Sequence, residues 1–132
     1  MSQENVEVVR SIFAAWERGD EAFLPFLDPE IEWHVRSDLP DSDIYRGLEG
    51  IERLTRTFDE VLDESWYSPR EFLDIDDQVV VVLSWGGRGK TSGIAFEERG
   101  ETWIFTLRDG KVIRIKEYSS KDEALEAAGL SE

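Results

Sequence analysis

Cysteine is absent from the chain, and histidine occurs once among its 132 residues. Without cysteine there can be no disulfide, thiolate nucleophile or cysteine-ligated zinc or iron–sulfur site. One histidine also argues against a histidine-based metal site, and we expect neither a metal nor an organic cofactor. Long apolar runs are missing too, since the longest aliphatic run, residues 79–83, cannot span a bilayer, and the N-terminus lacks the features of a signal peptide. We therefore expect a cytoplasmic protein.

Positive charge is scarce. The chain carries 15 Lys and Arg against 30 Asp and Glu, which gives a formal net charge of −15. This charge repels phosphate backbones and anionic lipid surfaces, so nucleic acid and membrane are not expected as partners. Because the acidic residues are spread along the whole chain, we interpret them as a solubilising surface.

Apolar packing material, in contrast, is plentiful. Hydrophobic residues make up 40% of the chain, which includes five Trp, three Tyr and seven Phe. This is more than a disordered acidic chain contains, and 132 residues suit one hydrophobic core better than two. We expect a single domain over residues 1–132.

Hydrophobic periodicity predicts four helices. A stripe with i, i+3, i+4, i+7 spacing indicates a first helix that ends at Gly19, and its members are Val9, Ile12, Phe13 and Trp16. A short second helix over residues 20–27 would be capped by Asp20 and distorted by Pro25. A third is expected over residues 48–63, and a last one follows the capping-box spacing of Ser120 and Glu123.

Strands are predicted between and after these helices. Alternation of apolar and polar residues marks a strand over residues 30–36, and a polar loop, residues 37–47, follows it. Further strands are expected at 70–75, 78–87, 93–107 and 112–118, joined by Asp76-Asp77 and by the hairpin signal Asp109-Gly110. Arg99-Gly100 should bend the third of these four. Sequential hairpins imply an antiparallel sheet, so the fold class is α+β.

The expected sheet has large apolar residues on both of its faces. Residues 79–83 are apolar at every position, and Trp103, Ile104 and Phe105 alternate between the faces. Helices can cover only one face. We infer that a second copy of the chain covers part of the other, as a homodimer with twofold symmetry.

Two residues are candidates for proton transfer. His34 is the side chain whose ordinary pKa lies nearest neutrality, although Ile31, Trp33 and Val35 form the apolar face of its strand and would turn His34 outward. Glu117 shares a strand face with buried isoleucines, where desolvation would raise its pKa and make it a usable acid or base. The alternative for Glu117 is a rim carboxylate paired with a basic residue.

Aromatic residues are candidates for a ligand wall. Those expected on inward faces either form plain core or line a pocket for a planar ring compound, and they are Trp16, Trp33, Trp85, Trp103 and Phe105. Tyr45, at the end of the polar loop, is expected at the pocket mouth, where its hydroxyl could orient a ligand. The loop carboxylates Asp38, Asp41 and Asp43 are interpreted as solvated.

A Gly-Lys-Thr sequence at Gly89, Lys90 and Thr91 has some likeness to a phosphate-binding loop. The leading glycine is missing because Ser84 stands there, and a strand rather than a helix is expected to follow. We interpret these residues as a twisted hairpin at the sheet edge.

Several segments together resemble the SnoaL-like branch of the nuclear transport factor 2 superfamily. They are WERGD, DPEIEW, YRGLEGIERL, GRGKTSG and the closing DGKVIRIKEYSSKDEALEAAGL, and their order spans nearly the whole chain. The resemblance implies a cone-shaped, highly curved antiparallel sheet with three N-terminal-region helices on its concave face, a short C-terminal helix, and commonly a dimer. It implies activity only loosely, because relatives include isomerases, cyclases, a dehydratase and an epoxide hydrolase as well as transport adaptors.

The residues of ketosteroid isomerases do not carry over to this chain. Their tyrosine position falls near Ile12, and their strand acid falls near Thr102 or Trp103. Their base falls on Trp33 or His34, so that mechanism is not expected.

These observations predict a pocket protein for a hydrophobic ring compound. Its activity could be cofactor-independent isomerisation, cyclisation or dehydration by proton transfer through His34 and Glu117. The alternative is a non-catalytic domain that binds a ligand or another protein. The sequence leaves the choice between enzyme and binding module open.

Overall fold

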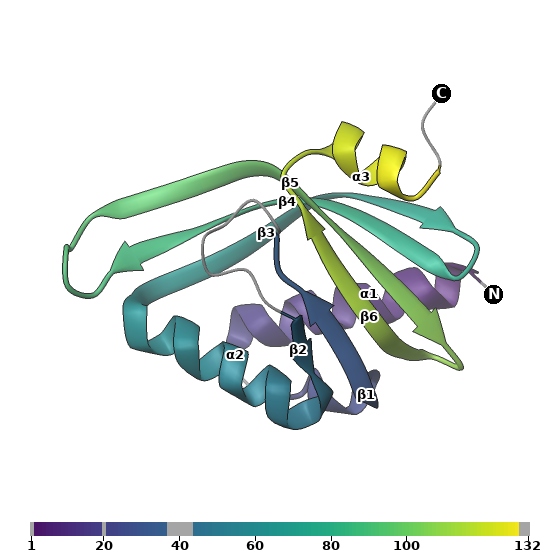
Figure 1. Ribbon diagram of the computed structural model, residues 1–132, viewed down its shortest axis with the longest axis horizontal. Helices are drawn as coiled ribbons and strands as arrows, with labels where there is room; N and C mark the ends of the chain where they lie inside the picture. Colours follow the sequence, from purple (N-terminus) through teal and green to yellow (C-terminus); the bar gives the residue numbers. More distant parts are fainter. Residues whose placement is uncertain (1, 20, 37–43, 130–132) are drawn as a thin grey trace.

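The computed structural model describes residues 2–19, 21–36 and 44–129. A curved six-stranded sheet forms its centre, with strand order β2-β1-β6-β5-β4-β3. Helices α1 (Ser2–Arg18) and α2 (Gly47–Val61) cover one face, and α3 (Lys121–Ala127) lies on the other (Figure 1). We call these the inner and the outer face. The architecture confirms the predicted α+β class and the curved sheet.

The strands pair mostly as hairpins. Their bounds are β1 (Leu27–His34), β2 (Ile44–Arg46), β3 (Leu62–Ile75), β4 (Gln78–Gly89), β5 (Ala95–Arg108) and β6 (Lys111–Tyr118). Neighbouring strands run antiparallel as predicted, except that β1 and β6 pair in parallel. The parallel pair arises because the chain leaves β1 through β2 and α2 and returns beside it only after three consecutive hairpin strands.

The N-terminal helices differ partly from the prediction. Val9, Ile12 and Phe13 of the α1 stripe are buried as expected, whereas Trp16 is partly exposed. Gly19, at a φ of 73°, ends the helix in the left-handed region that glycine favours. The predicted second helix is only a 3₁₀ turn, η1 (Leu24–Phe26), with Pro25 inside it. Strand β1 begins at once with Leu27 and includes Asp28 and Pro29, although an Asp-Pro pair is typical of turns. The proposed cap, Asp20, lies outside the described residues.

Two stretches of strand were not predicted. β2 lies within the segment that we expected to be loop, whose residues 37–43 are outside the described part of the chain. β3 starts at Leu62, where a helix was expected to continue, and its first half shows no regular alternation of burial. Register shifts after Asp63 and Pro69 explain why the period-two pattern fails there.

The predicted turns are confirmed. Asp109 and Gly110 have φ values of 54° and 76°, as a type I′ hairpin turn requires. Gly100, at a φ of 78°, lies beside the register shift that separates the pairs Leu83–Glu101 and Trp85–Glu98. Gly89 ends β4 and a strand follows the turn, so the Gly-Lys-Thr sequence opens no helix.

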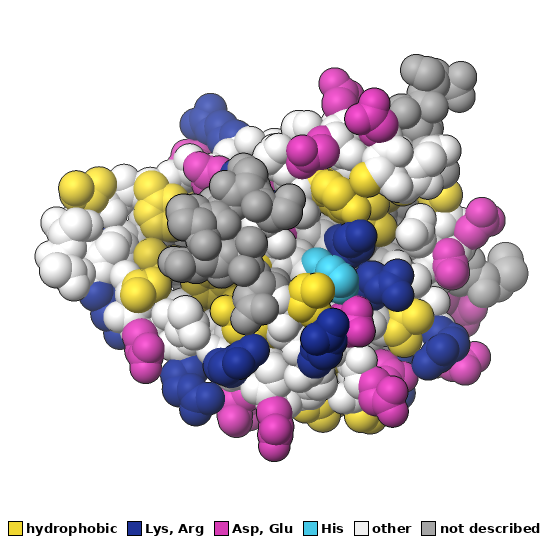
Figure 2. Space-filling view, viewed as in Figure 1, with side chains coloured by type: hydrophobic (Ala, Val, Ile, Leu, Met, Phe, Trp, Pro, Cys, Tyr) yellow, Lys and Arg dark blue, Asp and Glu magenta, His cyan; other side chains and the backbone are white. Residues whose placement is uncertain are grey.

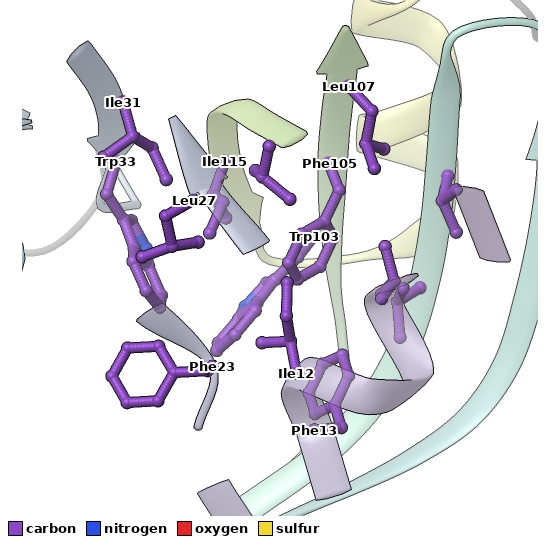
Figure 3. Packing of buried hydrophobic residues seen from close by; sticks show 14 of the residues in the cluster. Ile12, Phe13, Phe23, Leu27, Ile31, Trp33, Trp103, Phe105, Leu107 and Ile115 are labelled. Atoms are coloured by element: carbon purple, nitrogen blue, oxygen red, sulfur yellow. The ribbon is translucent and has the colours of Figure 1, made fainter. Parts of the chain in front are cut away.

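The main core lies between the inner face and the helices (Figure 3). A smaller cluster joins Val80 and Ile104, on the outer face of the sheet, to Ala124 of α3. Ser120 caps α3 as predicted, since its Oγ accepts from Glu123 N at 3.2 Å. The return bond differs from that of a capping box by one residue, because Glu123 Oε1 accepts from Ser119 N, at 2.9 Å. Within the described ranges, no helix is long and apolar enough to cross a membrane.

Candidate functional site

Strand register decides which side chains meet on the inner face. Trp103 of β5 lies opposite Glu117 of β6, and Trp33 of β1 lies opposite Ile115 of β6. Because side chains alternate along a strand, these positions share one face, which is the face covered by α1. The register therefore brings Glu117 among large aromatic residues.

Five aromatic side chains from five elements form what we call the aromatic wall: Trp16 of α1, Trp33 of β1, Tyr67 of β3, Trp85 of β4 and Trp103 of β5. The ring centroids of Trp33 and Trp103 are 5.4 Å apart, and Trp16 lies 5.7 Å from Trp33 and 6.1 Å from Trp103. Trp33 and Trp103 are buried, whereas Trp16, Tyr67 and Trp85 are partly exposed. The wall thus has a buried base and an accessible edge.

Glu117 is held at this wall by two N–H donors. Trp33 Nε1 donates to Glu117 Oε2 at 2.7 Å, and the backbone N–H of Arg36 donates to Oε1 at 3.4 Å. The residue as a whole is half-buried, and both of its carboxyl oxygens have a protein donor. The hydrogen bonds fix the orientation that proton transfer needs.

Glu101 is a second, more deeply buried carboxylate, only 2% exposed. Its Oε1 accepts from Trp103 Nε1 at 2.7 Å, and its Oε2 accepts from Trp85 Nε1 at 2.9 Å and from Arg36 Nη1 at 3.0 Å. Arg36 also pairs with Glu98 at 3.1 Å. Three N–H donors, one of them charged, satisfy the buried carboxylate in place of water. We call Glu101 and Glu117 the carboxylate pair.

Burial and Glu101 both affect the pKa of Glu117. Burial raises the pKa of Glu117 to about 8, and the negative charge of Glu101 adds to the rise. The hydrogen bonds from Trp33 and from the Arg36 backbone act in the opposite direction, because they stabilise the ionised form. Near neutral pH the Glu117 carboxyl is therefore mostly protonated, yet close enough to its pKa to exchange a proton.

Tyr67 lies within the wall and carries its one hydroxyl group. Its ring centroid is 5.6 Å from Trp16 and 5.7 Å from Trp103. Burial raises the pKa of the Tyr67 hydroxyl, and the carboxylates of Glu117 and Glu101 raise it further. The group is therefore a neutral hydrogen-bond donor across the physiological range.

His34 lies on the outer face, away from the carboxylate pair. Its Nε2 is 3.0 Å from Glu32 Oε1, and this hydrogen bond lowers the pKa of the Glu32 carboxyl. Figure 2 shows the single histidine at the surface among basic and acidic side chains. The structure does not bring His34 and Glu117 together, because Trp33, its neighbour in the strand, takes the inward position.

Tyr45 and Phe105 flank the wall without completing it. Tyr45 lies opposite Trp33 in the β1–β2 register, with the guanidinium of Arg53 4.7 Å from its ring centroid. Phe105 is fully buried against Phe13, at 5.8 Å between centroids, and belongs to the core. Phe105 therefore has no surface to offer a ligand in this conformation.

A groove of about 520 Å³ lies apart from the carboxylate pair, beside the long β4–β5 hairpin. Its lining includes Trp66, Arg88 and Phe96.

Among the residues that the structure describes, no group of three or more His, Asp or Glu side chains is placed to hold a metal ion. The oxygens of the carboxylate pair accept their hydrogen bonds from N–H groups of the protein.

Sequence reasoning missed Glu101, Arg36 and Tyr67. A signal for Glu101 existed, because it shares the period-two face of Trp103 and Phe105. For Arg36 the pattern was misleading, because alternation over residues 30–36 put it on the face of His34, whereas β1 ends at His34 and the Arg36 side chain reaches Glu101. Tyr67 lies in the half of β3 that was not predicted as strand.

Comparison with known proteins agrees with this fold. A profile described as the SnoaL-like domain matches residues 9–115. Among solved structures, an NTF2-like protein from Burkholderia xenovorans is 32% identical, with a TM-score of 0.76 over 89% of this chain and 90% of that one. An NTF2-like protein from Burkholderia thailandensis is 23% identical, with a TM-score of 0.80 over 97% of this chain and 98% of that one.

A third structure shares the fold at lower identity. It is a hypothetical protein with a ketosteroid isomerase-like fold from Catenulispora acidiphila, in complex with trimethylamine. It is 17% identical, with a TM-score of 0.72 over 95% of this chain and 94% of that one. Comparison with curated proteins finds no match. The chain belongs to the SnoaL-like family, within the NTF2-like superfamily, as the sequence resemblance predicted.

Proposed function

We propose that the protein binds a small hydrophobic ring compound against the aromatic wall and transfers a proton through Glu117. The observation that carries this proposal is the Glu117 carboxyl, which lies 2.7 Å from Trp33 Nε1 and whose pKa is raised by burial and by the charge of Glu101. A carboxyl that titrates at about 8 can give up or take a proton near neutral pH without a cofactor. Isomerisation, cyclisation and dehydration are the reactions that such a group serves.

Each part of the site has a distinct role in this proposal. The wall supplies apolar area and planar faces for a ring, and its indole N–H groups are already bonded to the carboxylate pair. Glu101 keeps a negative charge near Glu117 and raises its proton affinity. His34 takes no part, because it lies on the outer face.

Deuterium exchange tests proton transfer without knowledge of the natural substrate. Cyclohexanone and 2-tetralone are incubated with the protein in D₂O, and loss of the α-proton signals is followed by NMR. We expect exchange above the buffer rate that rises as pH increases through about 8, since removal of an α-proton needs the ionised Glu117. Glu117→Gln should abolish the excess, whereas Glu126→Gln, on the exposed side of α3, should not. Undiminished exchange in Glu117→Gln would contradict the assignment.

A non-catalytic ligand-binding function is the second candidate. It is favoured by the close packing of the wall, whose rings lie 5.4 to 6.1 Å from one another and so cover part of one another's faces. The trimethylamine complex of the Catenulispora acidiphila protein adds an amine to the ligands worth testing. Saturable binding, read from Trp fluorescence, without exchange of any ketone would favour this function.

Self-association through the outer face belongs to the same proposal. The α3 helix covers Val80 and Ile104, while Trp66 and Ile94 near the β4–β5 hairpin are 39% and 68% exposed. Burying such apolar area against a second copy would stabilise a dimer. Light scattering after size exclusion should give twice the chain mass at micromolar concentration, and a monomer mass would contradict it.

A further inference from the structure

The groove beside the β4–β5 hairpin, which we call the hairpin groove, has an indole ring in its lining. Trp66 of β3 supplies this ring and is 39% exposed. Gly86 of β4 makes room for it, because a Cβ there would lie 2.9 Å from Trp66 Cζ2 and 3.1 Å from Cε2. The indole therefore lies directly against the strand backbone and presents its remaining surface to the groove and the solvent.

Glu64 enters the lining from an unusual backbone position. Its φ of 55° is in the left-handed region that residues other than glycine rarely adopt, at the register shift between Asp63 and Trp66. The Glu64 carboxylate accepts from Arg88 Nε at 3.2 Å, and Arg88 Nη1 donates to the Gly93 carbonyl at 2.8 Å. Arg88, which also lines the groove, is thus held by acceptors of the protein itself.

The charge of the lining is negative. Glu97 of β5 adds a second carboxylate, so two carboxylates stand against the one guanidinium of Arg88. Arg99 pairs with Glu97, with its Nε 2.9 Å from Oε2, but the Arg99 side chain is 80% exposed and water screens the pair. The formal net charge of −15 on the whole chain also repels anions from the groove.

An indole beside carboxylates recognises one class of ligand. The face of an indole attracts a cation, and more strongly when alkyl groups on the charged nitrogen reduce its hydration. A nearby carboxylate adds attraction for the same charge. A neutral compound of equal shape gains only the contact with the ring, and an anion is repelled.

We propose that the hairpin groove binds a small organic cation, an ammonium with alkyl groups on its nitrogen, whose charge lies between the Trp66 indole and the carboxylates of Glu64 and Glu97. The volume of the groove, about 520 Å³, falls within the size of ordinary small-molecule sites. This site is separate from the proposed function, because it shares no residue with the aromatic wall or with the carboxylate pair.

Choline and 3,3-dimethylbutan-1-ol test the site, because they have the same shape and differ in the charge. Each is titrated at low salt into ¹⁵N-labelled protein, and the indole N–H signals are followed by NMR. The chain has five tryptophans, so five signals are expected, and Trp66→Phe identifies that of Trp66. We expect choline to move the Trp66 signal and to bind about tenfold more tightly than the alcohol.

Glu97→Gln should weaken choline binding about threefold and leave the alcohol unaffected. Glu126→Gln is the matched control, because it removes the same charge from an exposed position on α3 and should change neither affinity. Arg99→Gln removes the cation that already pairs with Glu97. Choline should therefore bind this variant more tightly than the wild type.

Equal affinities for choline and the alcohol would overturn the site, as would equal losses in Glu97→Gln and Glu126→Gln. Choline that moves the signals of Trp16 or Trp85 but not that of Trp66 would place the cation at the aromatic wall and overturn it too. A second copy of the chain could bury the same indole. A Trp66 signal that moves with protein concentration and ignores choline would assign the groove to self-association instead. Ketone exchange plays no part in these outcomes, so proton transfer stands or falls separately.

Discussion

Trp33 Nε1 lies 2.7 Å from Glu117 Oε2, so an indole from the first strand holds a carboxyl group of the last one. The two residues are 84 positions apart in the chain, and they meet because β1 and β6 pair in parallel. The bond fixes the orientation of Glu117 and also stabilises its ionised form. Trp33 therefore moderates the proton affinity that burial and Glu101 create.

Replacing Trp33 by Phe should raise the pKa of Glu117 further, because the carboxylate loses its shortest hydrogen bond. The titration is followed by ¹³C NMR of the glutamate carboxyl groups, with Glu117→Gln to assign the signal. Trp66→Phe, a change at an exposed tryptophan near the β4–β5 hairpin, serves as control. An unchanged or lower pKa in Trp33→Phe would contradict the role assigned to the indole.

Glu101→Gln should have the opposite effect. Removal of the neighbouring negative charge lowers the pKa of Glu117 toward its ordinary value, while the amide oxygen can still accept from one of the two indoles, Trp85 or Trp103. The same NMR titration measures the shift. Glu98→Gln removes a more exposed partner of Arg36 and should change the pKa of Glu117 less. Equal shifts in the two variants would show that Arg36, rather than the charge of Glu101, controls Glu117.

Stability should fall with rising pH. The pKa of Glu117 is about 8 in the folded protein against 4.5 for a free carboxyl, so the folded state binds the extra proton between these values. The stabilisation of the folded state by this proton is fully present below pH 4.5 and is lost as pH rises through about 8. Because Glu117 is partly exposed to solvent, we expect the free energy of unfolding to fall by only about 2–3 kcal/mol between pH 5 and 9.

Urea unfolding at a series of pH values measures this slope. Glu117→Gln has no proton to lose there, so its stability should change less over the same interval. Other carboxyl groups contribute equally to the slopes of both proteins, which makes their difference the quantity to compare. Identical slopes would argue that Glu117 titrates normally.

Gly86→Ala should destabilise the β4–β5 hairpin. A Cβ at Gly86 would lie 2.4 Å from the Phe96 carbonyl oxygen and 2.9 Å from the Trp66 ring, so backbone as well as side chain must move. At Gly87 the nearest atom would be 3.2 Å away, at Ser65 Cα. We expect thermal unfolding to show a loss of about 2–3 kcal/mol for Gly86→Ala and less for Gly87→Ala. The reverse order would contradict the close approach.

Ser120→Ala should loosen α3 from the outer face. The variant loses the acceptor for Glu123 N, which lies 3.2 Å from the Ser120 hydroxyl. Loss of such a cap costs about 1 kcal/mol in denaturant unfolding. Ser120→Asp keeps an acceptor at the same position and should retain most of the stability.

Local features of this fold could be predicted from the sequence. The stripe of α1, the Asp109-Gly110 turn and the Ser120 cap each depend on residues a few positions apart, and periodicity or turn chemistry indicates them directly. Alternation along β1 likewise allowed for an outward His34, because Trp33 takes the inner face.

The site depended on relations that periodicity does not contain. The network of Glu101 needs Arg36 from beyond β1 and Trp85 from β4, and no spacing within one segment indicates which strands become neighbours. The first half of β3, which carries Tyr67, was missed because its register shifts break alternation. The sequence thus indicated Glu117 and Trp33 as site residues, but not the hydrogen bond between them or the network of Glu101.

The parallel pairing of β1 and β6 also has a consequence for folding during synthesis. Trp33 and Ile115 are register partners, so β1 emerges from the ribosome long before the strand beside which it lies. Until β6 is made, only the three-residue β2 can pair with β1, and Ile31 and Trp33 lack their final neighbours. Closing so long a chain segment slows folding. We expect nascent chains that end before residue 111 to be bound by chaperones and to lack the native packing of Trp33, and the ligand site to form last.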